Sequence, residues 1–95
     1  MTKNYILNFL KEHKEELKNN FSLTKIGLFG SYAKNTARKD SDIDIVIEST
    51  EKDFFLRDDL REYLEANFEI PVDVGYLSSF REYYRMKIEK DIIYV

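Results

Sequence analysis

The segment from residue 42 to residue 48, Asp-Ile-Asp-Ile-Val-Ile-Glu, has isoleucine at every second position, and three of the four positions between and beside the isoleucines are acidic. In a β-strand, residues i and i+2 lie on one face about 6.6 Å apart. The segment is therefore predicted to be a strand with Asp42 and Asp44 on one face and its isoleucines on the other, packed on a helix. Two carboxylates in an apolar strand are costly unless cations compensate their charge. The alternative is a frayed strand start with two solvated acids.

A glycine–serine pair, Gly30-Ser31, ends the run of residues 23–29, which is predicted to be a strand. Glycine permits a sharp turn and the close approach of a ligand to the backbone. Ser31 is expected at the start of a short helix, where free backbone N–H groups and the helix dipole favour a phosphate group. On these two residues alone, an ordinary strand–turn–helix corner with a serine cap is the other interpretation.

A third acid, Asp73, lies between two valines in residues 70–77, which are predicted to be another strand. If this strand is a neighbour of the 42–48 strand, three carboxylates converge, and like charges about 5 Å apart repel by about 3 kcal/mol per pair at an effective dielectric of about 20. Divalent cations reverse this repulsion. Magnesium is expected because it takes carboxylate, water and phosphate oxygens together, whereas zinc prefers His or Cys. The chain has no cysteine, and His13 is its only histidine.

The rest of the chain alternates helices with strands. Helices are indicated by apolar residues at helical spacing and by capping residues at their starts. Strands are indicated by short runs rich in Ile and Val. The pattern favours an α+β fold. The predicted helices run from a cap at Thr2 to about residue 20, from 53 to 67, and from a capping box at Ser79 and Glu82 to about 88, and residues 92–95 form an edge strand or simply pack.

Length and charge exclude several classes of protein. With 95 residues, the chain is near the small end of what folds alone, so one domain over residues 1–95 is expected. The net charge of −3 makes general nucleic-acid binding a poor interpretation. No apolar run approaches the roughly 20 residues of a membrane span. The lack of cysteine fits a reducing cytoplasm.

The spacing of these motifs resembles a known signature. Gly30-Ser31, ten further residues, Asp42-Ile43-Asp44 and a later Asp73 are similar to the pattern of the DNA polymerase β-like nucleotidyltransferase superfamily. The short length, with Tyr32-Ala33 and Ala37-Arg38 between the motifs, resembles the minimal nucleotidyltransferases (MNT), the MntA-like antitoxins of HEPN/MNT toxin–antitoxin pairs. This resemblance implies a polymerase β-like fold, a small mixed β-sheet flanked by helices.

The resemblance also implies roles for individual residues. Gly30 and Ser31 would hold the β and γ phosphates of ATP. Asp42 and Asp44 would bridge two Mg²⁺ ions in a two-metal arrangement. Asp73 would bind the first ion and help to take the proton from the attacking hydroxyl.

One stretch departs from the usual pattern. Where many members read Ala-Arg-Gly, this chain reads Ala33-Lys34-Asn35. The loop keeps a cation, and asparagine tolerates the left-handed backbone that glycine would adopt. Lys34 and Arg38 are candidates for pairing with phosphate oxygens, and a solvated loop is the equal alternative for both.

The acceptor is expected to be another protein, because residues 1–95 leave no room for an acceptor-binding domain. The resemblance implies transfer of AMP from ATP to tyrosine of a cognate HEPN ribonuclease toxin. Two other possibilities stay open: an antitoxin that neutralises by binding alone, and a nucleotidyltransferase for a small molecule or a nucleic-acid end. The acidic residues 51–69 and the basic residues 81–90 are candidate docking faces or ordinary solvated helices. Four aromatic residues are predicted to serve the core or an interface rather than to stack on adenine: Tyr76, Phe80, Tyr83 and Tyr84.

Overall fold

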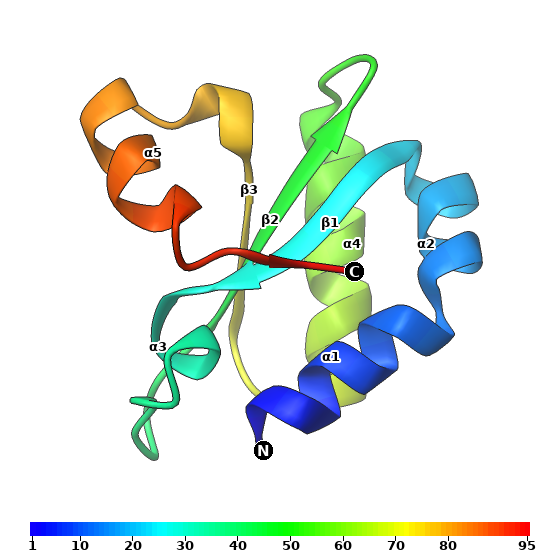
Figure 1. Ribbon diagram of the computed structural model, residues 1–95. Helices are drawn as coiled ribbons and strands as arrows, with labels where there is room; N and C mark the ends of the chain where they lie inside the picture. The colour runs from blue at the N-terminus through cyan, green and yellow to red at the C-terminus, as the bar shows by residue number, and fades with distance from the viewer.

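A mixed four-stranded sheet with helices around it forms the computed structural model, which describes residues 1–95 (Figure 1). In chain order the elements are α1 (Lys3–Glu12), α2 (Lys14–Phe21), β1 (Leu23–Phe29), α3 (Gly30–Ala33), β2 (Ile43–Ser49), α4 (Phe54–Phe68), β3 (Val72–Tyr76), the 3-10 turn η1 (Leu77–Ser79), α5 (Glu82–Glu89) and β4 (Ile93–Tyr94). The strand order across the sheet is β3-β2-β1-β4. This arrangement confirms the predicted fold class.

The two kinds of strand pairing follow from the connections. β1 is antiparallel to β2 and to β4, whereas β2 and β3 are parallel. Parallel strands need a long crossover, and α4 supplies it. The predicted strand over residues 23–29 is confirmed with the same bounds as β1. Asp53 caps α4 by accepting hydrogen bonds from the backbone N–H groups of Phe55 and Leu56, at 3.0 and 3.1 Å.

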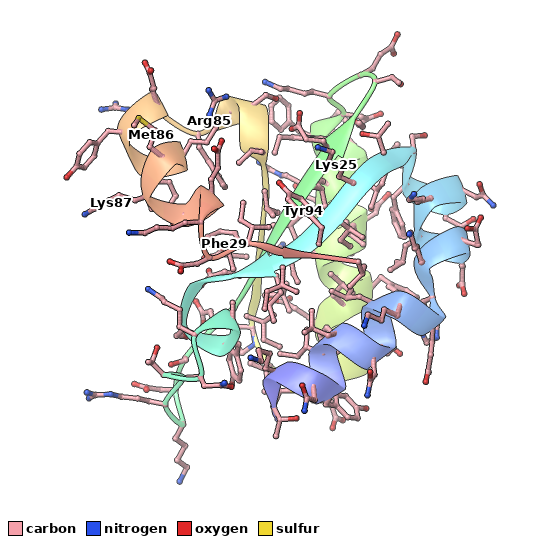
Figure 2. All side chains as sticks on the ribbon, viewed as in Figure 1. Lys25, Phe29, Arg85, Met86, Lys87 and Tyr94 are labelled. Atoms are coloured by element: carbon pink, nitrogen blue, oxygen red, sulfur yellow. The ribbon has the colours of Figure 1, made fainter.

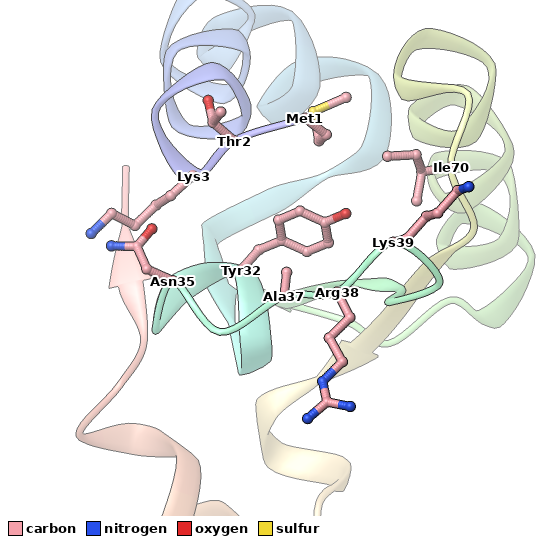
Figure 3. Close-up of a pocket in the computed structure, with 9 residues that line it drawn as sticks. All are labelled: Met1, Thr2, Lys3, Tyr32, Asn35, Ala37, Arg38, Lys39 and Ile70. Carbon is pink, nitrogen blue, oxygen red and sulfur yellow. The ribbon is translucent and has the colours of Figure 1, made fainter.

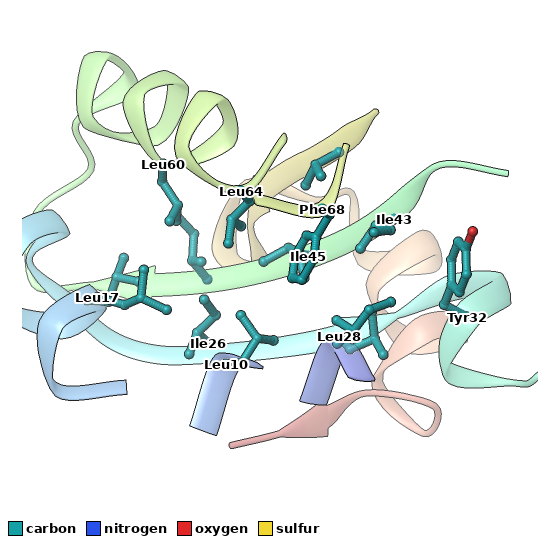
Figure 4. Packing of buried hydrophobic residues seen from close by; sticks show 14 of the residues in the cluster. Leu10, Leu17, Ile26, Leu28, Tyr32, Ile43, Ile45, Leu60, Leu64 and Phe68 are labelled. Atoms are coloured by element: carbon teal, nitrogen blue, oxygen red, sulfur yellow. The ribbon is translucent and has the colours of Figure 1, made fainter. Parts of the chain in front are cut away.

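One face of β1 and β2 is buried beneath α1, α2 and α4 (Figure 4). On this face Ile26 lies opposite Ile47 and Leu28 lies opposite Ile45, and all four side chains are almost completely buried. Burial of a side chain of this size contributes about 2 kcal/mol, so the isoleucine face of β2 is a major source of stability, as its alternation predicts. The helices cover it with Ile6 and Leu10 from α1, Leu17 from α2, and Leu60, Leu64 and Phe68 from α4.

The single N-terminal helix that the sequence predicts is in fact two helices. Thr2 caps α1 by accepting a hydrogen bond from the backbone N–H of Tyr5 at 3.1 Å, as expected. The chain then leaves helical geometry at His13. The His13 ring stacks on Phe9, with 4.1 Å between ring centroids, and its Nδ1 lies 2.8 Å from the Phe9 carbonyl oxygen. The His13 ring therefore approaches the same Phe9 carbonyl oxygen that accepts the backbone hydrogen bond from His13. The spacing of apolar residues does not reveal such a local contact.

The C-terminal segment differs from its prediction at its start. Ser79 lies in η1 rather than at a helix cap, and α5 begins at Glu82 without a side-chain cap. The predicted capping box is therefore wrong, because residues 77–80 turn to place the Phe80 ring against the sheet, where it contacts Phe29. α5 has no buried residue, and Figure 1 shows it set apart from α1 and α2. β4 pairs with β1, so residues 92–95 contain the edge strand that was one of the two expectations.

None of the helices combines the length and the apolar composition that crossing a bilayer requires.

Candidate active site

Three neighbouring strands bring two of the predicted carboxylates together. Asp44 on β2 lies opposite Phe29 on β1 and opposite Asp73 on β3. Residues that pair across a sheet point to the same face, so this row lies on the face opposite the buried isoleucines. Asp44 is half-buried and Asp73 is exposed. The condition set by the sequence, that the two strands be neighbours, is met.

Asp42 is placed differently from the prediction. It is exposed and precedes β2, which begins at Ile43. The backbone N–H of Ile43 donates to the carbonyl of Pro71 at 3.0 Å, which ties the start of β2 to the start of β3. Asp42 still acts on the site, because its charge adds to the field at Asp44. Burial raises the pKa of Asp44 from 3.8 to about 6, with further contributions from the charges of Asp73 and Asp42.

The charges of this cluster suit a cation. None of the four ion pairs in the structure involves Asp42, Asp44 or Asp73. The available donors are carboxylate oxygens, which are the ligands that Mg²⁺ prefers. As the side chains lie here, however, no three acids or histidines surround one point closely enough to form a ready set of metal ligands. The cluster therefore fits Mg²⁺ in charge and donor chemistry, without being a closed metal cage.

Gly30 is required at its position for two reasons. Its φ of +74° lies in the region that residues with a side chain rarely adopt. A Cβ atom there would lie 2.1 Å from Oδ2 of Asp44, far inside contact distance. The glycine thus lets the backbone at the start of α3 pass directly beside the half-buried carboxylate. Ser31 follows on α3 and is half-buried.

A basic cavity of about 390 Å³ opens beside Gly30 and Asp44. Lys34, predicted from the sequence, lines it. Lys87 and Lys90 also line it, and sequence reasoning did not single them out as site residues. The signal was present in the basic composition of residues 81–90, which was interpreted as a docking or solvated face. The other lining residues are Phe29, Tyr84, Ile88 and Asp91.

A second cavity, of about 280 Å³, also has Asp44 in its lining. It contains Asp73 and is walled by aromatic rings, including Tyr84, which also lines the basic cavity. Burial raises the pKa of the Tyr84 hydroxyl, and the negative charges of Asp44 and Asp73 raise it further. The remaining lining residues are Phe29, Ile45, Arg57, Val74, Gly75, Tyr76, Ser79 and Phe80.

Arg38 lies apart from these two cavities. It lines a separate cavity of about 490 Å³ with Tyr32 and Lys39, shown in Figure 3. Asn35, at the departure from the usual motif, has φ of +59°, so the left-handed backbone expected at this position is present.

Comparison with known proteins agrees with this geometry. The nucleotidyltransferase domain family matches residues 10–95. The protein adenylyltransferase MntA of Thermococcus cleftensis is 35% identical over 96 residues, which cover 100% of this chain and 97% of that protein. The likeness therefore extends over both chains almost completely.

Two solved structures have the same fold. A toxin–antitoxin structure with AMP-PNP is 30% identical with a TM-score of 0.62, covering 85% of this chain and 61% of that one. A chain from the complex of tri-AMPylated Shewanella oneidensis HEPN toxin with MNT antitoxin has a TM-score of 0.67 at 22% identity. That match covers 92% of this chain and 69% of the other.

Proposed function

This chain belongs to the nucleotidyltransferase domain family and is a homologue of protein adenylyltransferase MntA, as its motifs indicate, and we propose that it transfers AMP from ATP to a tyrosine of a HEPN toxin. Residues 1–95 would act as one domain. The observation that carries the proposal is the row Phe29–Asp44–Asp73, whose Phe29 and Asp44 line both the basic and the aromatic cavity.

The triphosphate would bind in the basic cavity, which Gly30 and Lys34 line. Ser31 is not among the lining residues but follows Gly30 on α3. Gly30 and Ser31 would bring backbone N–H groups and a hydroxyl to the β and γ phosphates, and Lys34 would add a positive charge. Arg38 stays a candidate for phosphate binding, although it lies in a different cavity. The α-phosphate would then face Asp44, which is shared by both cavities.

Asp42, Asp44 and Asp73 would hold Mg²⁺, and the family pattern implies two ions. Bound magnesium would neutralise the charge that develops on the phosphate oxygens. Without a cation, three carboxylates and a triphosphate would repel one another. Asp73, which is exposed and lines the aromatic cavity, would accept the proton of an incoming hydroxyl. In-line transfer depends mainly on such positioning and charge neutralisation.

The aromatic cavity suits a tyrosine acceptor. Its walls carry the Phe80 and Tyr84 rings, which can contact another aromatic ring. The antitoxin relative that shares this fold was solved with an AMPylated HEPN toxin. A partner protein would bring its own tyrosine to the site. The reaction would take place in the cytoplasm, where ATP and Mg²⁺ are available.

The test is transfer to a HEPN-domain toxin that co-purifies with the protein or is encoded beside it. Purified protein, toxin, ATP and Mg²⁺ are expected to add AMP to a toxin tyrosine, detected by intact mass and peptide mapping. Asp44→Asn should abolish the addition. Glu48→Gln, which makes the same change on the same face of β2 beyond the lining of both cavities, serves as the matched control.

Three results would overturn the proposal. Equal inhibition of the toxin without ATP, unaffected by Asp44→Asn, would indicate an antitoxin that acts by binding alone. Labelling of RNA or of a small molecule by radioactive ATP, with none on protein, would indicate a different acceptor. No labelled product of any kind, from folded protein with its partner, would contradict a transferase function.

A further inference from the structure

We propose that Tyr84 is an internal acceptor, so that without a partner the protein transfers AMP from ATP to the hydroxyl of its own Tyr84. The inference rests on the proposed function, because it uses the same donor and the same carboxylates. It adds a modification site on α5, at the border between the two cavities.

The position of Tyr84 is the first argument. Only three residues line both the basic and the aromatic cavity: Phe29, Asp44 and Tyr84. Phe29 has no reactive group, and Asp44 is a candidate metal ligand. Tyr84 is thus the one hydroxyl-bearing side chain shared by the place of the triphosphate and the place of the acceptor.

An aromatic stack holds Tyr84 there. Its ring meets Phe80 edge to face, with 5.3 Å between centroids and 79° between ring planes. Phe80 in turn meets Phe29, the residue opposite Asp44, at 5.9 Å and 64°. A Cβ at Gly75 would come within 2.6 Å of Phe80, so this glycine lets the Phe80 ring lie directly on β3. The stack thus runs from the carboxylate row on the sheet to α5.

The electrostatic environment of the hydroxyl is the second argument. Three tyrosines have a raised pKa, and their charged neighbours differ. For Tyr63 the neighbour is Glu16, and for Tyr94 they are glutamates. At Tyr84 burial is the larger cause of the raised pKa, and the charged neighbours are Asp44 and Asp73, which line cavities that Tyr84 also lines. Bound cations would replace this repulsion with attraction for a phenolate.

The transfer itself needs no other reactant. The phenolic oxygen of Tyr84 would attack the α-phosphorus of ATP, forming a P–O bond. The bond between the α-phosphorus and the bridging oxygen would break, and pyrophosphate would leave with the electron pair. The phenolic proton would pass to the carboxylate of Asp73 or to water. No atom is oxidised or reduced, and the product is an AMP phosphodiester on Tyr84.

The neighbouring Tyr83 offers a matched control. It is 74% exposed, against 47% for Tyr84, and lines neither cavity. The Lys87 ammonium lies 5.2 Å from the centre of the Tyr83 ring, and Figure 2 shows the Lys87 side chain extending from α5. Tyr83 therefore shares the residue type and the helix with Tyr84, but it is not in the lining of either cavity.

The experiment is incubation of the purified full chain with ATP and Mg²⁺ and no partner, followed by intact mass and peptide mapping. One AMP on Tyr84 is expected. Tyr84→Phe should reduce self-labelling at least about tenfold, because an acceptor held at the site has a large effective concentration. Tyr83→Phe should leave it unchanged. Because the acceptor is internal, the rate per molecule should not depend on protein concentration, and Asp44→Asn protein mixed with wild type should stay unlabelled.

The outcomes separate this inference from the proposed function. A toxin that is modified while the lone protein stays unlabelled overturns the internal acceptor and leaves the proposed function intact. Label on Tyr84 with no transfer to the toxin supports the internal acceptor and overturns the proposed function. Label on Tyr83, or label on Tyr84 of the Asp44→Asn protein in the mixture, also overturns the internal acceptor. Far-UV circular dichroism of Tyr84→Phe checks that loss of label is not loss of fold.

Discussion

The two faces of β2 carry different kinds of side chain around Asp44. One face presents Ile43, Ile45 and Ile47 to three helices, and these side chains are almost completely buried. The other presents Asp44 beside Asp73, with no ion pair to either acid. The same strand therefore stabilises the fold on one side and stores uncompensated charge on the other.

Neighbouring residues of β2 point to opposite faces of the sheet, so those that stabilise the core alternate with Asp44, the proposed metal ligand. Because strand side chains alternate, the position of Asp44 is fixed by the buried Ile43 and Ile45 on either side of it in the sequence. The paired strands hold Asp44 and Asp73 opposite each other, and such fixed positioning of charged groups is what a metal-dependent phosphoryl site uses. Natural proteins commonly accept some loss of stability at such sites. Five predictions test the comparison, in order of decreasing effect.

The largest effect is expected for Asp44→Asn. Loss of a proposed metal ligand should lower the rate of AMP transfer at least about a thousandfold. The same change should raise the free energy of unfolding at neutral pH by about 1 kcal/mol after allowance for solvent screening, because it removes a half-buried charge that two other acids repel. Activity assays and urea denaturation measure the two effects. A variant that loses activity and stability together would contradict the comparison.

The opposite face should respond in the opposite way. Ile47→Ala is expected to lower the free energy of unfolding by about 3 kcal/mol, because it opens a cavity under the helices, and Ile47→Val by about 1 kcal/mol. Ile47 lines neither cavity, so the specific activity of the molecules that remain folded should stay near wild type. Urea denaturation combined with an activity assay tests this. Wild-type stability in Ile47→Ala would show that this face of β2 does not contribute to the core.

Gly30 lies beside Asp44 and lines the basic cavity, so Gly30→Ala should lower both the stability and the activity. A positive φ and the overlap with Asp44 predict a loss of about 2 kcal/mol of stability together with lower activity. Asn35→Gly is the contrasting change at another positive φ, with an expected effect within about 0.5 kcal/mol. Thermal denaturation of both variants measures the difference. Equal stability of Gly30→Ala and wild type would contradict the close approach.

The pH dependence of stability offers a smaller effect. In the folded protein the pKa of Asp44 is raised to about 6 from 3.8, so the folded state holds this proton more tightly than the unfolded state. The resulting stabilisation is fully present below 3.8 and is lost as the pH rises through about 6. Allowing for solvent screening, it amounts to about 1 kcal/mol. The measurement is wild-type stability minus Asp44→Asn stability in metal-free buffer, and a difference that does not change with pH would contradict it.

The smallest effect is expected for Lys34, a cation in the lining of the basic cavity. Lys34→Ala should raise the KM for ATP by about threefold to tenfold with little change in kcat, since an exposed charge on a phosphate adds about 1 kcal/mol. Lys39→Ala, in the lining of the separate cavity of about 490 Å³, should leave the KM for ATP unchanged. Steady-state kinetics with varied ATP decides this, and Arg38→Ala in the same assay decides whether Arg38 contacts phosphate. An unchanged KM in Lys34→Ala would remove it from the site.

Much of the fold was predictable because its signals are local. The strand over residues 23–29 and the helix that follows Asp53 carry clear periodicity and a cap. The break at His13 was missed because it depends on one ring and one carbonyl within an otherwise regular helical pattern. The capping box at Ser79 was wrong because contacts with the sheet outweigh a local preference.

The sequence alone determined the family and the candidate residues, because glycine, serine and aspartate at fixed spacing form a motif whose side chains suit phosphate and metal. It also determined the mixed fold, because the spacing of apolar residues indicates the helices and strands. Only the tertiary structure decided that Asp44 and Asp73 lie opposite each other, that Asp42 stands outside the strand, and that α5 brings Lys87, Lys90 and Tyr84 to the site. Those placements depend on strand order and on how residues 77–95 pack over the sheet. Such contacts join segments far apart in the chain, and no local pattern records them.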